Sequence, residues 1–217
     1  MNRSVPAAIV LTAFGAAAMA ASAKTEEGVR LFDARSFPEA RAVLEAAARE
    51  DPRDARALYY LGRTLYAQSE TAKAAEWLEK AVALDPGSAD KHRWLARVWG
   101  TLAQSANVFK QASLAPKIRR EFERTVELDP ENTEARSDLM EFYIQAPGIM
   151  GGSIEKARVQ AAEIARRDRL RGYVASARIA DYEGHPDAAL AEYDRAALEF
   201  PDRIDPVIGT VNLRVKK

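Results

Sequence analysis

Hydrophobic residues recur every three or four positions over much of the chain, and short polar or proline-containing breaks separate these stretches. Leu58, Leu61 and Leu65 show the spacing clearly, because residues three and four apart lie on one face of an α-helix. Asp-Pro ends several of the stretches, and the residue before a proline is disfavoured in helical backbone. The pattern predicts an all-α fold built from pairs of short helices.

Two of these helix pairs repeat each other. The stretch "GVRLFDARSFPEARAVLEAAAREDP" begins at Gly28, and "GRTLYAQSETAKAAEWLEKAVALDP" begins 34 residues later, at Gly62. The residues that match at this distance are Gly28 and Gly62, Ala40 and Ala74, Leu44 and Leu78, Ala47 and Ala81, and Pro52 and Pro86. Glycine and alanine at repeated places let two helices approach closely, so the period indicates a helical repeat.

The repeated residues resemble the tetratricopeptide repeat (TPR) family, whose unit is a helix–turn–helix of 34 residues. The second unit fits best, with Leu58, Leu61, Gly62, Leu65, Ala74, Leu78, Ala81 and Pro86. Three degenerate units follow, and the third carries an insertion around residues 104–115. The resemblance implies a right-handed superhelix of about five stacked helix pairs, which would form a repeat domain over residues 24–201.

Local signals mark the expected helix starts. Candidate N-caps are Ser36, Thr71, Ser88, Thr133 and Ser153, because a side-chain oxygen can accept from the first free backbone N–H groups. Pro38, Pro116 and Pro186 are expected in first turns, where the missing N–H has no cost.

The N-terminus predicts export. Residues 1–23 read as a signal peptide: Arg3 precedes an apolar run from Val5 to Ala20, and the small residues 21–23 suit a signal peptidase. Cleavage after Ala20 and a retained membrane anchor are the alternatives. We expect a periplasmic protein, with secretion as the alternative and no stable membrane insertion after cleavage.

The C-terminal residues 202–217 lack the helical pattern, since they contain Pro206, Gly209 and several β-branched residues. We expect an irregular tail that covers the last helix pair, through the apolar residues Ile204, Val207, Ile208 and Leu213. In the alternative, the exposed end of the array docks on a partner or on a second copy, so the oligomeric state stays open.

Composition argues against several classes of function. Lys plus Arg equals Asp plus Glu at 32 each, which gives no global charge for nucleic acid. The basic stretch from Arg166 to Arg171 is interrupted by Asp168, so we expect no nucleic-acid partner. The chain has no cysteine, which excludes disulfides, thiolate metal sites and a cysteine nucleophile.

Neither metal binding nor catalysis is expected. The acidic residues around His185 alternate as metal ligands can, but Gly184 and Pro186 make the same segment an ordinary turn between helices. His92 is the other histidine of the chain, and no nucleophile motif accompanies either. We therefore predict a protein that is not an enzyme and that has no metal and no cofactor.

The glycine-rich segment Gly148–Ser153 invites comparison with phosphate-binding loops. It lacks the spacing of a P-loop and the lysine after the last glycine, and a helical pattern precedes it where a P-loop has a strand. We predict a long turn in which two glycines adopt positive φ and Ser153 caps the next helix. Binding of an anion or small ligand by this loop is the alternative.

A stripe of arginine and tyrosine is the strongest candidate for recognition. Its members on the first helices are Arg56, Tyr59, Arg63, Tyr66, Arg93, Arg97 and Arg178. Residues 56, 59, 63 and 66 are spaced by three, four and three, which places them on one helix face. The fourth unit breaks the stripe with Glu134 and Glu141. A solvated surface covered by arginine stems is the alternative interpretation.

The TPR resemblance implies that first-helix residues line a concave groove. Arginine can bind a carboxylate there through two parallel hydrogen bonds. We therefore predict an exported scaffold that binds a protein or peptide partner, possibly acidic, along this groove. The alternative is an assembly module that acts through its end faces and the 104–115 insertion.

Overall fold

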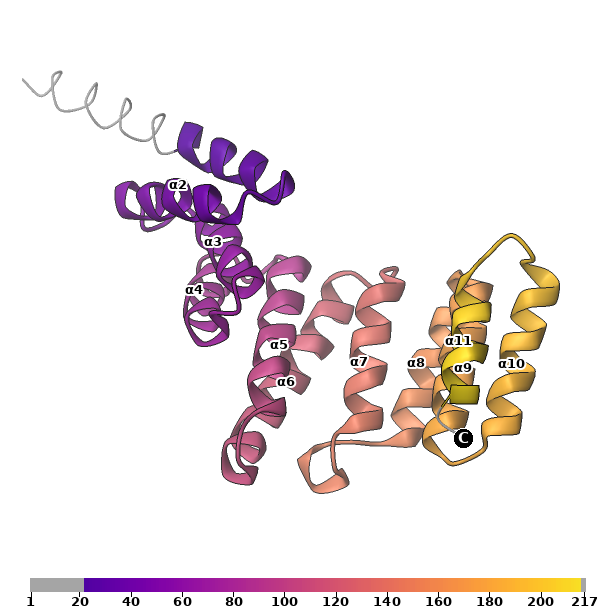
Figure 1. The fold of residues 1–217 in the computed structure, drawn as a ribbon. Coiled ribbons are helices and arrows are strands. Elements are labelled where there is room, and N and C mark those ends of the chain that lie inside the picture. The colour runs from indigo at the N-terminus through magenta and orange to yellow at the C-terminus, as the bar shows by residue number, and fades with distance from the viewer. Residues whose placement is uncertain (1–21, 216–217) are drawn as a thin grey trace, which may run out of the picture. The chain divides into compact units, whose positions relative to one another are not determined.

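The structure is a computed structural model that describes residues 22–215. Over this range it consists of α-helices joined by short turns and one 3-10 turn, without strands, which confirms the all-α prediction (Figure 1). The predicted signal peptide lies outside the described residues except for residues 22 and 23, which are helical. None of the helices in the described range is long and apolar enough to span a bilayer. The chain divides into two compact units, up to Ser105 and from Ala106.

The first unit contains five helical segments that pack in chain order. Residues 22–33 are helical, and they are followed by α2 (Phe37–Glu50), α3 (Ala55–Ala67), α4 (Thr71–Leu84) and α5 (Ala89–Gln104). Each of α2, α3 and α4 packs on the next helix along the chain. These antiparallel neighbours are the helix pairs that the 34-residue period predicts.

The matching glycines have matching roles in this unit. A Cβ atom at Gly28 would overlap the side chain of Leu44, and one at Gly62 would crowd Leu78. Both leucines are fully buried. The same glycine–leucine contact is thus built twice, one period apart, and it holds the two helices of each pair close together.

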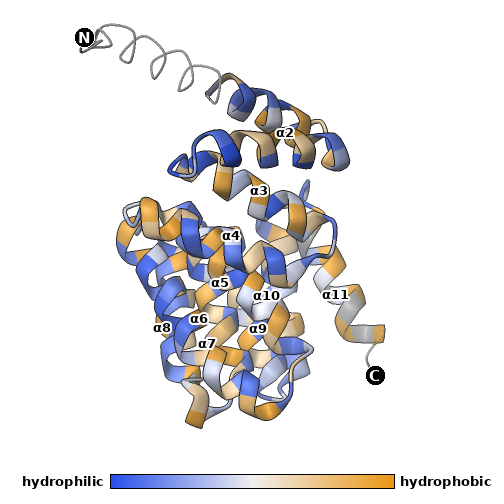
Figure 2. Ribbon diagram, turned by 90° about the vertical axis from the view of Figure 1, so that its left-hand side faces the viewer, coloured by the Kyte–Doolittle hydropathy of each residue, from blue (hydrophilic) through white to orange (hydrophobic). Residues whose placement is uncertain are grey.

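The second unit continues the same architecture with six helices. They are α6 (Val108–Leu128), α7 (Thr133–Gln145), α8 (Ile154–Arg167), α9 (Arg169–Tyr182), α10 (Pro186–Glu199) and α11 (Asp205–Val215). From α7 to α10 the helices stand side by side in chain order, and α11 packs on α10 and α9 (Figure 1). Hydrophobic and hydrophilic residues are interleaved along the helices of the described chain, as burial of one face requires (Figure 2).

Most of the 104–115 insertion is helical, since residues 108–115 begin α6, and the sequence did not lead us to expect this. Asn107 caps α6 by accepting from the backbone N–H of Lys110 at 3.0 Å, and the helix continues through Pro116 to Leu128. The prediction that Pro116 lies in a first turn is therefore wrong. The helix extends across it because Leu114 and Ile118 are buried on the same face.

The C-terminal tail is also helical rather than irregular. Leu213 is buried as predicted and packs with Ala177 and Ala189, but Ile204, Val207 and Ile208 remain at least half exposed. Pro206 is fully buried in their place. The tail does cover the last helix pair, but it does so with a different set of residues from the predicted one.

The helix caps follow the predictions only in part. Ser153 accepts from the backbone N–H of Lys156, and Pro38 and Pro186 lie in first turns. Thr71 and Thr133 are instead the first residues of their helices, and Asn132 caps α7 in place of Thr133. Asn132 directly precedes α7, and its side-chain oxygen accepts from the backbone N–H of Ala135 at 2.9 Å.

Candidate functional site

Arg63 of α3 lies among four aromatic rings of the first unit. Its guanidinium carbon is 4.5 Å from the ring centroids of both Phe32 and Trp94, and 5.2 and 5.3 Å from those of Tyr59 and Tyr60. The rings come from residues 22–33, α3 and α5, which are the first helices of three successive repeats. The guanidinium is therefore held by cation–π attraction from several sides.

Arg97 extends this cluster on α5. Its guanidinium carbon lies 5.0 Å from the Trp94 ring, and the residue is exposed. Among the described residues, neither Arg63 nor Arg97 has a carboxylate partner; Arg63 donates only to the Tyr59 hydroxyl, at 3.3 Å. We call Phe32, Tyr59, Tyr60, Arg63, Trp94 and Arg97 the Arg63 cluster.

Tyr59 belongs to this cluster as a buried side chain and does not line an open surface. Only 7% of its surface is exposed, so the prediction that it lines a groove is wrong for this side chain. Burial raises the pKa of its hydroxyl to about 12, against a smaller lowering by the charge of Arg63. Tyr59 is covered because its ring packs edge-on against Tyr60.

The other predicted groove residues of this unit are near the cluster but already have partners. Arg56 pairs with Glu26, and the Tyr66 hydroxyl lies 3.0 Å from Oγ1 of Thr101. The Tyr66 ring also packs edge-on against Trp94, at 6.0 Å between centroids. Arg93 is half-buried and also takes part in polar contacts.

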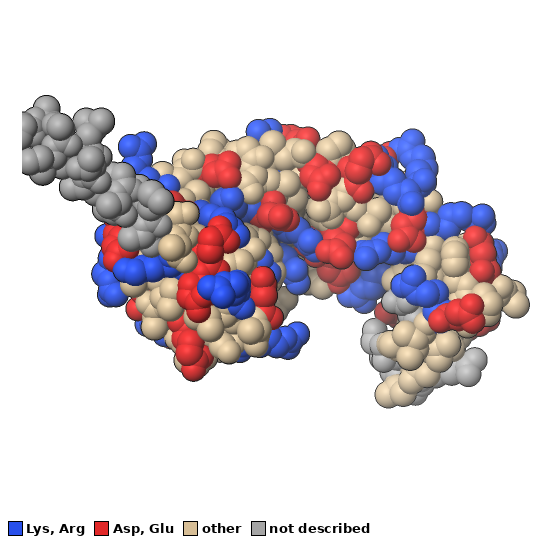
Figure 3. Space-filling model, turned by 90° about the horizontal axis from the view of Figure 1, so that it is seen from above, with Lys and Arg blue, Asp and Glu red and all other residues tan. Residues whose placement is uncertain are grey.

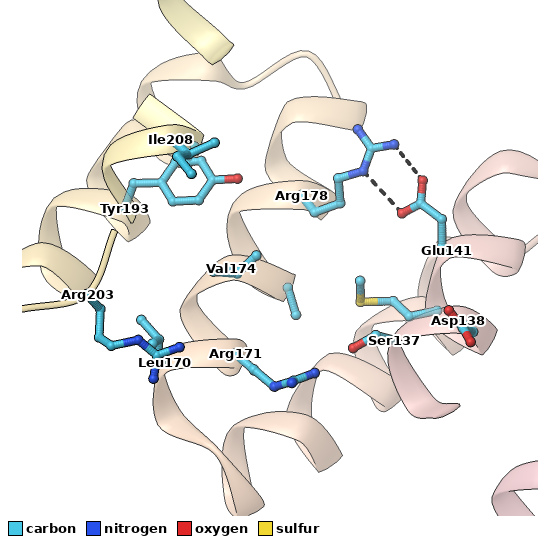
Figure 4. Close-up of a pocket in the computed structure, with 13 residues that line it drawn as sticks. Ser137, Asp138, Glu141, Leu170, Arg171, Val174, Arg178, Tyr193, Arg203 and Ile208 are labelled. Carbon is cyan, nitrogen blue, oxygen red and sulfur yellow. Dashed lines mark hydrogen bonds and ion pairs between the residues drawn. The ribbon is translucent and has the colours of Figure 1, made fainter. Parts of the chain in front are cut away.

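Arg178 belongs to the second unit and is tied to an acidic residue. It donates from Nη2 and Nε to the two carboxylate oxygens of Glu141, at 2.5 and 3.1 Å, and so joins α9 to α7 (Figure 4). Arg171, also on α9, donates from Nη2 to one carboxylate oxygen of Glu134 at 3.4 Å. Glu134 and Glu141, which interrupt the sequence stripe, are therefore ion-pair partners of arginines on α9.

The Glu141–Arg178 pair perturbs the acid. Burial raises the pKa of the Glu141 carboxyl, but hydrogen bonds from Arg178 and Gln145 outweigh it and lower the pKa below the ordinary value. Glu141 is therefore ionised at neutral pH, and Arg178 has little free charge to offer a ligand.

This ion pair forms one wall of a cavity of about 640 Å³ in the second unit. Residues of α7, α9, α10 and α11 line it, among them Met140, Val174, Tyr193 and Ile208 (Figure 4). The Tyr193 ring packs against Gly209 so closely that a Cβ atom there would overlap it, and its hydroxyl points into the space. The sequence did not reveal this cavity, because α11 was not expected to be a helix.

The glycine loop forms the predicted turn. Gly148–Met150 is a 3-10 turn, and Gly151 follows it with a φ of 101°. At Gly152 a glycine is required for a different reason, because a Cβ atom there would overlap the Ala146 carbonyl. The expectation of two positive-φ glycines is thus wrong for Gly152. The backbone N–H groups of residues 150–153 all donate to backbone carbonyls, so these four are not available to an anion.

His185 and its acidic neighbours are the candidate metal ligands that the sequence offers. No group of three or more potential ligands gathers anywhere among the described residues. His92 is buried, and its Nε2 lies 3.0 Å from the carbonyl oxygen of Pro86. Positive and negative side chains are interspersed over the face drawn in Figure 3, in agreement with the balanced composition.

Arg136 is a buried charged residue that the sequence analysis did not single out. Its Nε donates to the Pro130 carbonyl at 2.9 Å, and its Nη1 donates to Gln160 at 3.0 Å. These contacts join the turn before α7 to α8, so its role is structural. In the sequence, the one hint of its burial is its position next to Ala135, which belongs to the apolar face of α7.

Stacked antiparallel helix pairs, with an aromatic–arginine cluster on their first helices, define a helical-repeat protein. Residues 25–89 match the tetratricopeptide repeat family model. These residues are therefore tetratricopeptide repeats, and the chain has the fold of tetratricopeptide repeat proteins, as the resemblance implied. No curated protein matches the chain.

Solved structures agree on the fold. A thermophilic TPR protein from Thermus thermophilus is 20% identical, with a TM-score of 0.68 over 90% of this chain and 100% of the other. YrrB, a TPR protein with an unusual peptide-binding site, is 20% identical, with a TM-score of 0.64 over 85% and 88%. A TPR protein from Parabacteroides merdae is 17% identical, with a TM-score of 0.71 over 90% and 72%.

Proposed function

We propose that this chain is a non-catalytic scaffold that binds an acidic polypeptide segment at the Arg63 cluster. The fold supports a role in protein–protein interaction, since the chain is similar to TPR proteins such as YrrB, which is described as having a peptide-binding site. Export to the periplasm is part of the proposal and rests on the signal-peptide pattern of residues 1–23.

The observation that carries the proposal is the state of Arg63 and Arg97. Both guanidinium groups lie against the Trp94 ring, and neither has a carboxylate partner among the described residues. By contrast, Arg171 and Arg178 of the second unit are paired with glutamates of α7. The first unit therefore offers positive charge that a carboxylate of a partner can satisfy.

The chemistry of the cluster suits a carboxylate-bearing segment with apolar neighbours. A guanidinium group can bind a carboxylate through two parallel hydrogen bonds. The rings around Arg63 hold it in place before binding, so little side-chain freedom is lost when the ligand arrives. The Trp94 ring and Tyr66 next to the arginines provide apolar surface for the residues that flank the acid.

The test compares two charge reversals in the same unit. Arg97→Glu places a negative charge at the cluster, while Arg53→Glu makes the same change in an exposed turn, where no aromatic ring of the described residues lies against the arginine. A fluorescently labelled peptide rich in glutamate and leucine serves as the probe, and its glutamine-substituted counterpart serves as the uncharged comparison. Fluorescence anisotropy measures the affinity of each protein for both peptides.

We expect Arg97→Glu to weaken binding of the acidic peptide by about tenfold or more, a loss of about 1.4 kcal/mol. Arg53→Glu should retain the wild-type affinity apart from a small, salt-dependent change. Equal loss in both variants would show attraction by overall charge only. Unchanged binding by Arg97→Glu, or equal binding of the glutamine peptide, would reject the Arg63 cluster as the site.

A further inference from the structure

Helix α11 has two apolar faces. The inner face consists of Pro206, Gly209 and Leu213, which pack toward α10 and α9: Pro206 is fully buried, Leu213 is 6% exposed, and Gly209 touches the Tyr193 ring. This face accounts for the way in which the helix covers the last repeat. On the other side of the helix only Ile208 borders other parts of the unit, at the cavity beside Tyr193.

The outer face is equally apolar but exposed. Its members are Ile204, directly before the helix, and Val207, Ile208, Val211 and Val215, which are all between 50% and 80% exposed. We call these five residues the outer stripe. Their spacings of three, one, three and four place them on one side of a helix, opposite the inner face.

The outer stripe is unusual for the surface of this fold. Elsewhere in the second unit successive helices pack on their neighbours, whereas every member of the outer stripe is at least half exposed, including Ile208 at the edge of the cavity. Contiguous apolar surface of this kind marks an interaction site more often than it marks plain solvated surface. The stripe contains no ionisable residue, so it does not select a charged partner.

We propose that the outer stripe binds the outer stripe of a second copy of this chain, through a two-fold symmetric pair of α11 helices. In such an isologous contact the same patch serves both subunits, so an uncharged helix face with regular spacing is complementary to itself. Ile204, Ile208, Val211 and Val215 follow steps of four, three and four, which is the spacing that two packed helices share. The proposal is independent of the proposed function, because the Arg63 cluster lies in the other unit.

The size of the stripe agrees with a reversible dimer. Each exposed valine or isoleucine can remove roughly 100 Å² of apolar surface from water. Five such residues from each of two copies bury on the order of 1,000 Å², which is the lower limit for a specific protein interface. We therefore expect a dimer that dissociates on dilution.

The decisive experiment changes the centre of the stripe and compares it with a matched position. Val211 is 51% exposed on α11, and Val159 is 58% exposed on α8, away from the stripe. Sedimentation equilibrium on the chain as it is isolated measures self-association of the wild type, Val211→Glu and Val159→Glu. Circular dichroism verifies that both variants keep the wild-type helix content.

We expect the wild type and Val159→Glu to dimerise alike, and Val211→Glu to raise the dissociation constant by about tenfold or more. A wild type that stays monomeric at all accessible concentrations would overturn the proposal. Dimerisation that is unaffected by Val211→Glu would also overturn it. A third result would overturn it as well: a monomeric wild type that floats with phosphatidylglycerol vesicles, when Val211→Glu does not, would identify the outer stripe as a membrane contact.

A second measurement does not depend on whether Val211→Glu disturbs α11. The chain has no cysteine, so a single introduced cysteine reports its own position. Val211→Cys should form a disulfide-linked dimer under mild oxidation, because the middle of the stripe faces its counterpart across the two-fold axis. Val159→Cys should stay monomeric under the same conditions. Equal cross-linking of both variants, or of neither, contradicts the proposed contact.

Discussion

Arg63 contacts rings from three helical segments that are far apart in the sequence, and it therefore contributes to stability as well as to recognition. Its guanidinium carbon is within 5.3 Å of four ring centroids, and the buried Nε has no hydrogen-bond partner in the described part of the chain. Cation–π attraction is then the main interaction of the charge. A substitution at Arg63 would change both stability and binding, which is why the functional test uses Arg97.

We expect Arg63→Met to destabilise the chain by about 1 kcal/mol, since methionine keeps much of the apolar stem but has no cation for the rings. Arg97→Met, which removes a cation from beside one ring only, should cost less than half as much. Urea unfolding followed by circular dichroism gives both values. Equal costs at the two positions would mean that the four-ring environment of Arg63 adds no stability.

The same residues show how far a sequence can predict this site. The spacing of Arg56, Tyr59, Arg63 and Tyr66 correctly places them along one side of α3. It does not reveal that Tyr59 is covered while Arg63 stays accessible. That difference depends on rings of neighbouring helices, such as Phe32 and Trp94, and a one-dimensional period contains no information on which ring meets which cation.

At the scale of elements, the ion pairs between α7 and α9 predict a pH dependence. The folded pKa of Glu141 is lower than the ordinary value of 4.5 that it has in the unfolded chain. The pair with Arg178 therefore stabilises the fold above the unfolded pKa, and this stabilisation is lost as the pH falls through the lower, folded pKa. Both side chains are about one-third exposed, which limits the effect to about 1 kcal/mol or less.

We expect Glu141→Gln to lower the free energy of unfolding at neutral pH by that amount, and the difference from the wild type to shrink as the pH falls through the folded pKa and the wild-type carboxyl is protonated. Urea unfolding at several pH values checks both statements. Glu127→Gln, in the more exposed pair with Arg124 within α6, provides the control and should cost less at neutral pH. A difference that does not shrink as the pH is lowered from neutral until the fold is lost to acid would show that ionisation of Glu141 is not the cause.

The elements that the sequence misjudged share one physical reason. In α6 and α11 a proline suggested a break, but Pro116 is exposed on a helix held by Leu114 and Ile118, and Pro206 is buried near the start of α11. Burial of neighbouring apolar residues outweighs the local preference in both helices. By contrast, the glycine–leucine contacts at Gly28 and Gly62 were predictable, because the period repeats them.

At the scale of the whole molecule, the division of the chain into two compact units has a consequence for proteolysis. The units meet in sequence at Ser105 and Ala106, between α5 and α6. Just beyond this junction, Val108 and Phe109 begin α6 with side chains that are 59% and 83% exposed. The first turn of α6 thus has little apolar burial to hold it, whereas the next buried residue of the helix is Leu114.

Chymotrypsin cleaves after aromatic residues, and an exposed first turn can open locally to admit it. We therefore expect the first cut after Phe109, which gives two fragments that correspond to the two units and resist further digestion. Mass spectrometry of a time course identifies the cut, and Phe109→Ala should slow it without changing the later fragments.

First cleavage after Phe142 or Phe200, which lie in the second unit and are only partly exposed, would mean that this unit opens more readily than the junction. Fragments that keep their helix content would then establish that helix pairs on each side of residue 106 are stable by contacts within their own unit, as the nearest-neighbour stacking of helical repeats requires.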